Sequence, residues 1–243
     1  MKLCLTSSSV SGQAVPFRLV PVLATLIAIG MVTVACDTTT PLERLQGQLE
    51  QYPEYSVTLQ DMREDGYYHQ YGVVIGEPQA GAEDMVYRDS ILDWQQVGRR
   101  TYEQYQPHLG MVILSKGPDG VVDQNQHPPG YQQVGNERYG QWRDEGGGRS
   151  FWVFYGQYAL LSHMIGGFGR PIYRNDWNGY RSARDRGQTY YGPAGEYGSN
   201  GSVTRQTNPN FFRRQQSRQA ARSRSFGQRV NGRMSGGTRF GGK

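Results

Sequence analysis

Cysteine is almost absent from this chain of 243 residues, which contains only Cys4 and Cys36. Two cysteines exclude a disulfide-dense scaffold, and they exclude a zinc site built from cysteine alone, which requires four thiolates. Hydrophobic residues are also scarce, at 36% of the chain, and the mean hydropathy is -0.69. A protein with several membrane spans is therefore excluded, and we expect one modest hydrophobic core.

The sequence also lacks the motifs that usually mark catalysis or metal binding. It contains no HExxH, GxSxG, SxxK or GxxxxGK[ST] pattern. Ser115 and Lys116 are adjacent, so on a strand they would point to opposite faces. The histidines are isolated from one another and from both cysteines: His69, His108, His127 and His163. We therefore predict no catalytic residue, no metal site and no cofactor. An enzyme whose site is assembled from scattered residues is the alternative.

Charge is distributed very unevenly along the chain, whose formal net charge is +5 at pH 7. Residues 36–169 carry 9 basic and 18 acidic side chains, whereas residues 170–243 carry 15 basic and 3 acidic ones. No acidic residue follows Glu196. An acidic body is thus followed by a basic segment, and this asymmetry is typical of proteins whose basic part meets an anionic surface.

The N-terminus has the layout of an export signal. Lys2 and Arg18 precede an uncharged apolar run, residues 19–35, that ends in small residues. As a helix the run would be about 25 Å long, which is marginal for a bilayer core of about 30 Å. We therefore predict that residues 1–35 are a secretory signal peptide that is cleaved off. A short uncleaved membrane anchor and a buried helix are the alternatives.

The end of this run, Thr33-Val34-Ala35-Cys36, resembles the lipobox of bacterial lipoprotein precursors, with Thr33 where that family usually has Leu, Val or Ile. The resemblance implies transfer of a diacylglyceryl group to the Cys36 thiol, cleavage before Cys36, and acylation of the new amino group, for example with palmitate. Three acyl chains would anchor the protein durably. The implied location is the extracytoplasmic side of the cell membrane, with residues 36–40 as a tether. The resemblance assigns no family to the rest of the chain.

Residues 41–165 are predicted to form a small α+β domain, in which one or two helices pack on an antiparallel sheet. Leucines spaced i, i+3 and i+7 predict a helix over residues 41–52. Alternation of side chains predicts strands over 56–62 and 67–75, which a short turn would join as a hairpin. The most apolar strand is expected at residues 110–115.

Residues 150–165 allow two interpretations. Aromatic and apolar residues at helical spacing favour a helix that begins at Ser150 and closes the core. A second hairpin around Gly146-Gly147-Gly148 is the alternative. The surrounding stretch, rich in glycine and aromatic residues, includes Trp142 and Trp152. We expect it to be core rather than a ligand groove, because buried aromatic side chains dominate small cores.

Residues 166–243 are predicted to be a disordered basic tail rich in glycine and arginine. Its few apolar residues cannot offset a backbone ordering cost of about 1–2 kcal/mol per residue. A short helix around residues 211–224 is the one exception. Phe211 and Phe212 are the candidates for insertion at a membrane interface. Contact with polyanions is assigned to nine arginines: Arg205, Arg213, Arg214, Arg218, Arg222, Arg224, Arg229, Arg233 and Arg239.

These features together predict a lipid-anchored cell-envelope protein of structural or interaction type. Its basic tail would contact an anionic polymer, lipid headgroups or an acidic partner. Nucleic-acid binding through the arginines is the first alternative, which export would disfavour. An envelope enzyme with a site near Trp142 and Trp152 is the second alternative. A solvated tail that folds back on the acidic body would make no outside contact. Nothing in the sequence indicates an oligomeric state.

Overall fold

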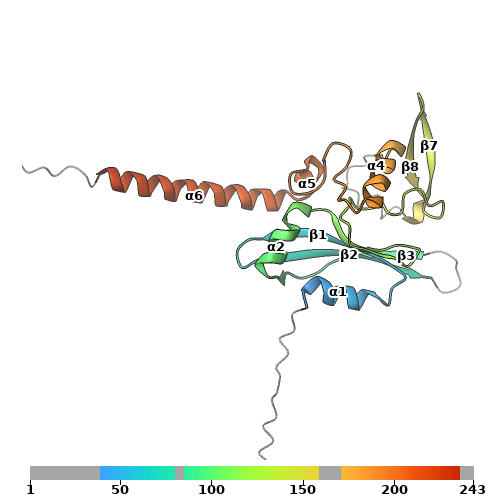
Figure 1. Cartoon of the computed structure of the whole chain (residues 1–243), viewed down its shortest axis with the longest axis horizontal. Coiled ribbons are helices and arrows are strands. Elements are labelled where there is room, and N and C mark those ends of the chain that lie inside the picture. Colours follow the sequence, from blue (N-terminus) through green and yellow to red (C-terminus); the bar gives the residue numbers. More distant parts are fainter. Residues whose placement is uncertain (1–38, 80–84, 159–170, 236–243) are drawn as a thin grey trace, which may run out of the picture. The chain divides into compact units, whose positions relative to one another are not determined.

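The computed structural model describes residues 39–79, 85–158 and 171–235 (Figure 1). Its centre is an antiparallel sheet with the strand order β3-β2-β1-β5-β6, and β4 pairs with β2 off this path. The strands are β1 (Glu54–Arg63), β2 (Tyr68–Pro78), β3 (Met85–Ile91), β4 (Gln95–Gln96), β5 (Val112–Lys116) and β6 (Val122–Asp123). The predicted α+β class with an antiparallel sheet is confirmed.

Strands β1 and β2 form the hairpin that the sequence predicts, with a turn in which Gly66 and Tyr67 have positive φ. The register of the pair shifts between Leu59 and Asp61, so Gln60 is the extra residue of a β-bulge. Strand β3 is absent from the sequence prediction. Most of its side chains are exposed, so its alternation is not expressed as a pattern of hydrophobicity.

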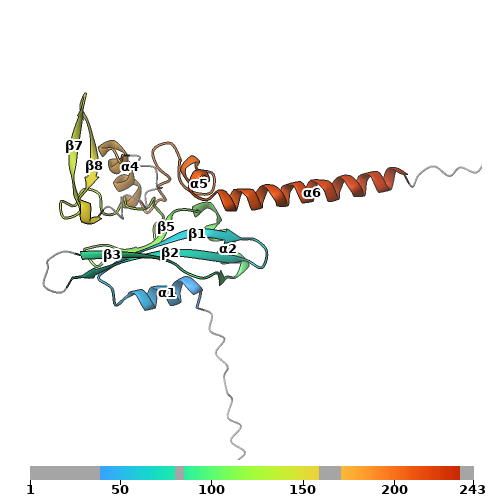
Figure 2. The same cartoon turned by 180° about the vertical axis from the view of Figure 1, so that it is seen from behind.

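Helix α1 (Pro41–Leu49) covers one face of the sheet, as Figures 1 and 2 show. It begins with a capping box, in which the Glu43 carboxylate accepts from the Thr40 backbone N–H at 2.6 Å. The three leucines that predict this helix are buried: Leu42, Leu45 and Leu49. They pack with inward-facing residues of the hairpin such as Val57 and Leu59. Helix α2 (Arg99–Tyr105) contributes the buried Tyr102 to the same core.

On the other side of the sheet from α1, β7 (Gly140–Gly146) and β8 (Arg149–Phe154) form a separate two-stranded hairpin (Figure 2). The predicted helix from Ser150 is therefore wrong over the described residues, and the hairpin alternative is correct. Three consecutive glycines at positive φ lie at the turn, and Trp142 stands opposite Trp152 in the register. Over so short a run, the spacing of aromatic residues fits a strand as well as a helix. The rest of the predicted helix, from residue 159, lies outside the described residues.

The aromatic-rich stretch packs with helix α4 (Arg174–Asp185) into a second small core. Trp152 is buried, and its ring centroid lies 5.1 Å from that of Trp142 in an edge-to-face arrangement. The Arg174 guanidinium lies 4.3 Å from the centroid of the Trp142 ring. Of the four aromatic residues expected in the core, Trp152 is buried there and Trp142 and Phe154 are partly buried against it, whereas Phe151 lies outside the core clusters of the described residues.

The predicted extent of the disordered tail has to be corrected, because the described residues beyond 170 are folded. They form α4, α5 (Ser202–Thr207) and α6 (Pro209–Ser235), and they bury Tyr180 and Tyr197. Both tyrosines pack against Tyr131, with ring centroids 5.6 and 6.4 Å away. Low apolar content predicts disorder when a segment has to fold by itself. This segment folds because a few of its aromatic side chains pack against aromatic residues of the body.

Helix α6 is the longest helix of the described residues, and it contains the short helix expected around residues 211–224. Within the described ranges, no helix combines the length and the apolar content needed to cross a bilayer. The predicted signal peptide and Cys36 lie outside the described residues.

Candidate functional site

The first turn of α6 is fixed to the body. Phe211 is buried in the main core, and its ring centroid lies 5.2 Å from that of Phe212, which packs against the same core. The side-chain amide of Asn208 donates to the carbonyl of Gln60, the bulged residue of β1. Phe211 is therefore unavailable for insertion into a membrane, and Phe212 is partly buried against the same core.

The next turns of α6 are held by arginines that pair with carboxylates at the β1–β2 end of the sheet. Arg214 Nη2 lies 2.5 Å from Asp61 Oδ1 and also donates to the Met62 carbonyl at 3.3 Å. Arg218 and Arg222 donate to the two oxygens of Glu64, at 3.0 and 3.2 Å. The spacing i, i+4, i+8 places all three arginines on one side of the helix.

The three pairs differ in solvent exposure, and this decides what each contributes. The side chains of Arg214 and Asp61 are 32% and 15% exposed, whereas those of Arg222 and Glu64 are 73% and 47% exposed. Exposed pairs contribute about 0–1 kcal/mol because solvent screens them. The pair of Arg214 with Asp61 is therefore the main electrostatic attachment of α6.

Stacking on an aromatic ring reinforces this attachment. Trp94 lies under the Arg63 guanidinium, 4.0 Å from the ring centroid, and the Arg214 guanidinium lies 6.0 Å from the same centroid. Planar guanidinium groups are attracted to the face of an indole ring. Arg214 is therefore held by charge, by a backbone carbonyl and by an aromatic neighbour together.

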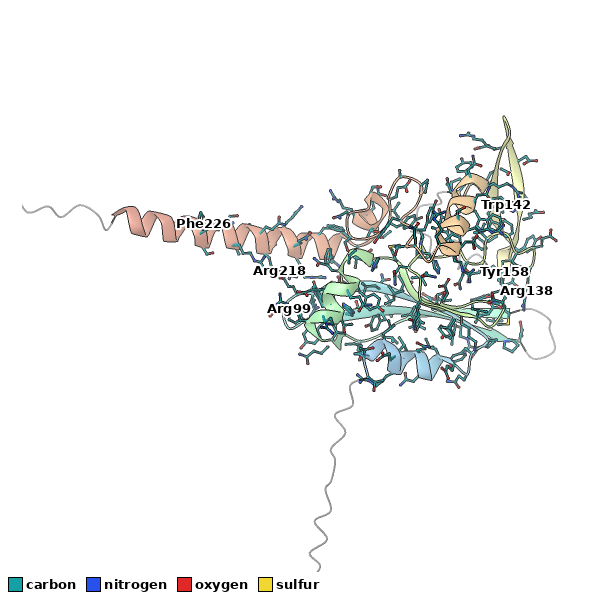
Figure 3. The ribbon with its side chains drawn as sticks, viewed as in Figure 1. Arg99, Arg138, Trp142, Tyr158, Arg218 and Phe226 are labelled. Atoms are coloured by element: carbon teal, nitrogen blue, oxygen red, sulfur yellow. The ribbon has the colours of Figure 1, made fainter. Side chains whose placement is uncertain are left out.

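A polar cleft of about 270 Å³ lies between α6, α2 and the β1–β2 turn. Arg99 and Arg218 line it from opposite helices, as Figure 3 shows, together with Tyr102. Arg99 pairs with Glu103 at 2.7 Å, and Arg218 pairs with Glu64. The charged groups that line the cleft thus neutralise one another, and the cleft offers a ligand little net charge.

Beyond these contacts, the side chains of α6 whose burial the structure describes are mostly exposed. The residues from Gln219 to Arg224 are all exposed, and Phe226 keeps 69% of its surface. We call residues 219–235 the distal half of α6. In Figures 1 and 2 no other described element runs beside this distal half. The whole of α6 contains seven arginines and no acidic residue. Residues 219–235 are therefore basic in sequence, and Arg224 presents its charge to the surroundings.

The nine arginines assigned to polyanion contact thus fall into distinct groups. Arg214, Arg218 and Arg222 are paired with the body. Arg205 on α5 stacks over Phe212, with its guanidinium 5.4 Å from the ring centroid. Four more of them lie along α6: Arg213, Arg224, Arg229 and Arg233. Arg239 lies outside the described residues.

Three of the four histidines belong to the described residues, and burial perturbs the pKa of each. Burial lowers the pKa of His69 to about 4, and its Nδ1 lies 3.2 Å from the Tyr71 hydroxyl. Burial also lowers the pKa of His127 and of His108. Among the described residues no group of histidine, cysteine and carboxylate side chains is arranged to hold a metal ion. His163 lies outside the described residues.

Sequence reasoning missed one buried carboxylate. Glu54 is 3% exposed, accepts the Tyr139 hydroxyl at 2.8 Å and accepts the Tyr87 hydroxyl as well. Arg138 lies 3.8 Å from the same carboxylate. Burial and the neighbouring Glu54 raise the pKa of both tyrosines. This cluster joins β1 and β3 to the segment before β7, and no sequence motif marks it because its members are far apart in the chain.

Comparison with known proteins finds no family model that matches the chain, and no curated protein and no solved structure matches it significantly.

Proposed function

We propose that this protein is a lipid-anchored interaction protein of the cell envelope, in which α6 contacts an anionic surface or polymer. One observation carries the proposal. The helix is attached to the body by Phe211 and Arg214, while residues 219–224 and Phe226 are exposed, and residues 219–235 carry arginines and no acidic residue. Attachment at one end holds the charged half outside the body, where a large polyanion has access to it.

The proposed anchor fits the start of the folded body. Thr40 caps α1, and the leucines of α1 are buried in the core. A lipid on Cys36 would then be joined to the body through residues 37–40, which span at most about 14 Å when extended. Such a short tether would keep the body close to the membrane. The acylated Cys36 would anchor the protein by itself, and α6 would add a second contact with the same surface.

The anchor is tested in the native cell. The N-terminal peptide of the mature protein should begin at Cys36 and carry the mass of an acylated cysteine. Cys36→Ser should yield an uncleaved or unanchored form. A Cys36→Ser product that keeps the mature size and partitions into detergent unchanged would contradict the anchor.

The polyanion contact is tested with inorganic polyphosphate as the probe. Binding of the full chain should weaken steeply with salt, because each neutralised phosphate releases a counterion. Three distal arginines are changed to glutamine in the test variant: Arg224, Arg229 and Arg233. This change should reduce the magnitude of the slope of log binding constant against log salt concentration by about two, taking the value of about 0.7 per contact known for single-stranded nucleic acid.

A matched control removes the same charge from exposed arginines elsewhere: Arg100, Arg143 and Arg186. It should leave binding almost unchanged. Equal effects of the two triple variants would show that net charge alone causes binding, and would contradict a site on α6. A parallel arm with single-stranded RNA of equal charge tests the alternative, since clearly tighter binding to RNA would favour a nucleic-acid-binding protein.

A further inference from the structure

The distal half of α6 combines its charge with a row of apolar residues. Phe226 is 69% exposed, more than the other exposed large hydrophobic residues of the described chain. Val230 and Met234 follow at i+4 and i+8, so the three positions share one side of the helix within about 80° at 100° per residue. An exposed phenylalanine on a polar helix, in line with two further apolar positions, indicates a contact surface.

Arginines border this apolar row. Positions 222, 229 and 233 lie within about 60° of Phe226 around the helix axis. Of the three pairs that attach α6, the one between Arg222 and Glu64 is the most exposed, so exchanging it for another anion costs least. An apolar stripe bordered by arginine is typical of helices that lie in the interface of an anionic membrane.

The stability of the helix points the same way. The segment from Gln219 to Ser235 contains Gly227 and Gly232, and glycine disfavours a helix by about 1 kcal/mol relative to alanine. Helices without tertiary support are marginal in water. The distal half of α6 therefore has the most to gain from a surface that stabilises its apolar side.

We propose that the distal half of α6 lies in the headgroup region of an anionic lipid membrane, with Phe226, Val230 and Met234 facing the acyl chains. This inference rests on the proposed function and names the partner of the same helix. A nucleic acid would use the arginines but would gain little from positions 230 and 234. A lipid surface uses the apolar row and the charge together. Phe211 and Phe212, which are covered by the body, take no part.

The depth of residue 226 in the bilayer is the direct test. A full chain with Cys4→Ser, Cys36→Ser and Phe226→Cys carries a nitroxide label at position 226. A matched chain carries the label through Arg224→Cys, about 160° away around the helix. On vesicles of phosphatidylcholine with one third phosphatidylglycerol, the label at 226 should become accessible to oxygen dissolved in the bilayer. The label at 224 should stay accessible to a water-soluble relaxation agent.

The arginines are tested on the labelled chain. Replacing three of them by glutamine should weaken association of position 226 with these vesicles about a hundredfold, since each arginine near an anionic surface contributes about fivefold. The three are Arg222, Arg229 and Arg233. The control triple variant at Arg100, Arg143 and Arg186 should weaken it much less.

The outcomes separate this inference from the proposed function. A label at 226 that stays in water on anionic vesicles, in a chain that still binds polyphosphate through α6, overturns the membrane contact and leaves the proposed function standing. Equal immersion on pure phosphatidylcholine vesicles overturns the role of the arginines. A chain that binds neither polyphosphate nor anionic vesicles overturns both.

Discussion

Breaking the contact between Arg214 and Asp61 tests how α6 is attached. We consider a double-mutant cycle with Arg214→Gln and Asp61→Asn in the full chain. The asparagine keeps the side-chain oxygen that accepts the Met62 backbone N–H at 2.7 Å, so the local turn is preserved. The cycle therefore reports the charge contact between helix and sheet.

The expected coupling energy follows from burial. Asp61 is 15% exposed at the side chain, and the 2.5 Å contact is a hydrogen bond between two charged groups. Hydrogen bonds to charged groups contribute about 1.5–3 kcal/mol, and partial exposure of Arg214 places this one near the lower end. We expect a coupling of about 1.5 kcal/mol. Loss of that much stability should lower the melting temperature by about 3–6 °C in a domain of this size.

A second cycle on the same helix provides the control. Arg222→Gln with Glu64→Gln breaks a pair of the same chemistry whose arginine is 73% exposed. Its coupling should be below about 0.5 kcal/mol and should vanish in 1 M salt, which screens exposed charges. Urea unfolding followed by circular dichroism measures both cycles. Equal coupling energies, or a coupling near zero for Arg214 with Asp61, would refute the argument from burial and leave Phe211 as the main attachment.

Three further predictions concern the core. His69 is neutral in the folded protein, so it contributes fully to the free energy of unfolding above its ordinary pKa of 6.5. The free energy of unfolding should therefore fall by up to about 3 kcal/mol as the pH drops toward 4. His69→Gln should flatten this fall in urea titrations, and an unchanged fall would show that other groups cause it. Glu54→Leu should destabilise the protein by about 3 kcal/mol, because it leaves the Tyr139 and Tyr87 hydroxyls without their acceptor. Thermal unfolding should show a smaller loss for Glu54→Gln, which keeps an acceptor oxygen. A larger loss for Glu54→Gln than for Glu54→Leu would contradict this role of Glu54. Burial raises the pKa of Tyr71, Tyr87 and Tyr139 above the ordinary value of 10, so stability should fall as the pH rises past 10. Ultraviolet titration should show these tyrosinates only as the protein unfolds, and their ionisation in a folded chain would contradict the buried positions.

The sequence predicts those elements whose apolar residues recur at regular intervals. The leucines of α1 recur at helical intervals, and the β1–β2 hairpin alternates around a turn. Strand β3 has mostly exposed side chains and offers no such signal. The aromatic residues of β8 are spaced in a way that fits a helix as well as a strand, and only the three glycines of the turn between β7 and β8 favour the hairpin.

The sequence predicts the charge of the candidate site but not its contacts with the body. The absence of acidic residues after Glu196 marks the basic segment, but composition does not reveal which arginines the body neutralises. Arg214 meets Asp61 across 153 positions of the chain. One signal could have indicated the contact: the spacing of four residues from Arg214 to Arg218 and on to Arg222 aligns three charges on one side of a helix, opposite a turn rich in carboxylates.

Hydrogen–deuterium exchange on the unmodified protein tests most directly whether the exposed half of α6 is the contact surface. Backbone amides of residues 219–235 should exchange rapidly in solution, because the core clusters of the described residues include none of this segment. Adding vesicles that contain phosphatidylglycerol should slow exchange in this segment, while the sheet and α1 keep their rates. Vesicles of phosphatidylcholine alone should leave the segment unprotected. Unchanged exchange over residues 219–235 in a sample that has bound the anionic vesicles, or protection confined to the body, would contradict the account.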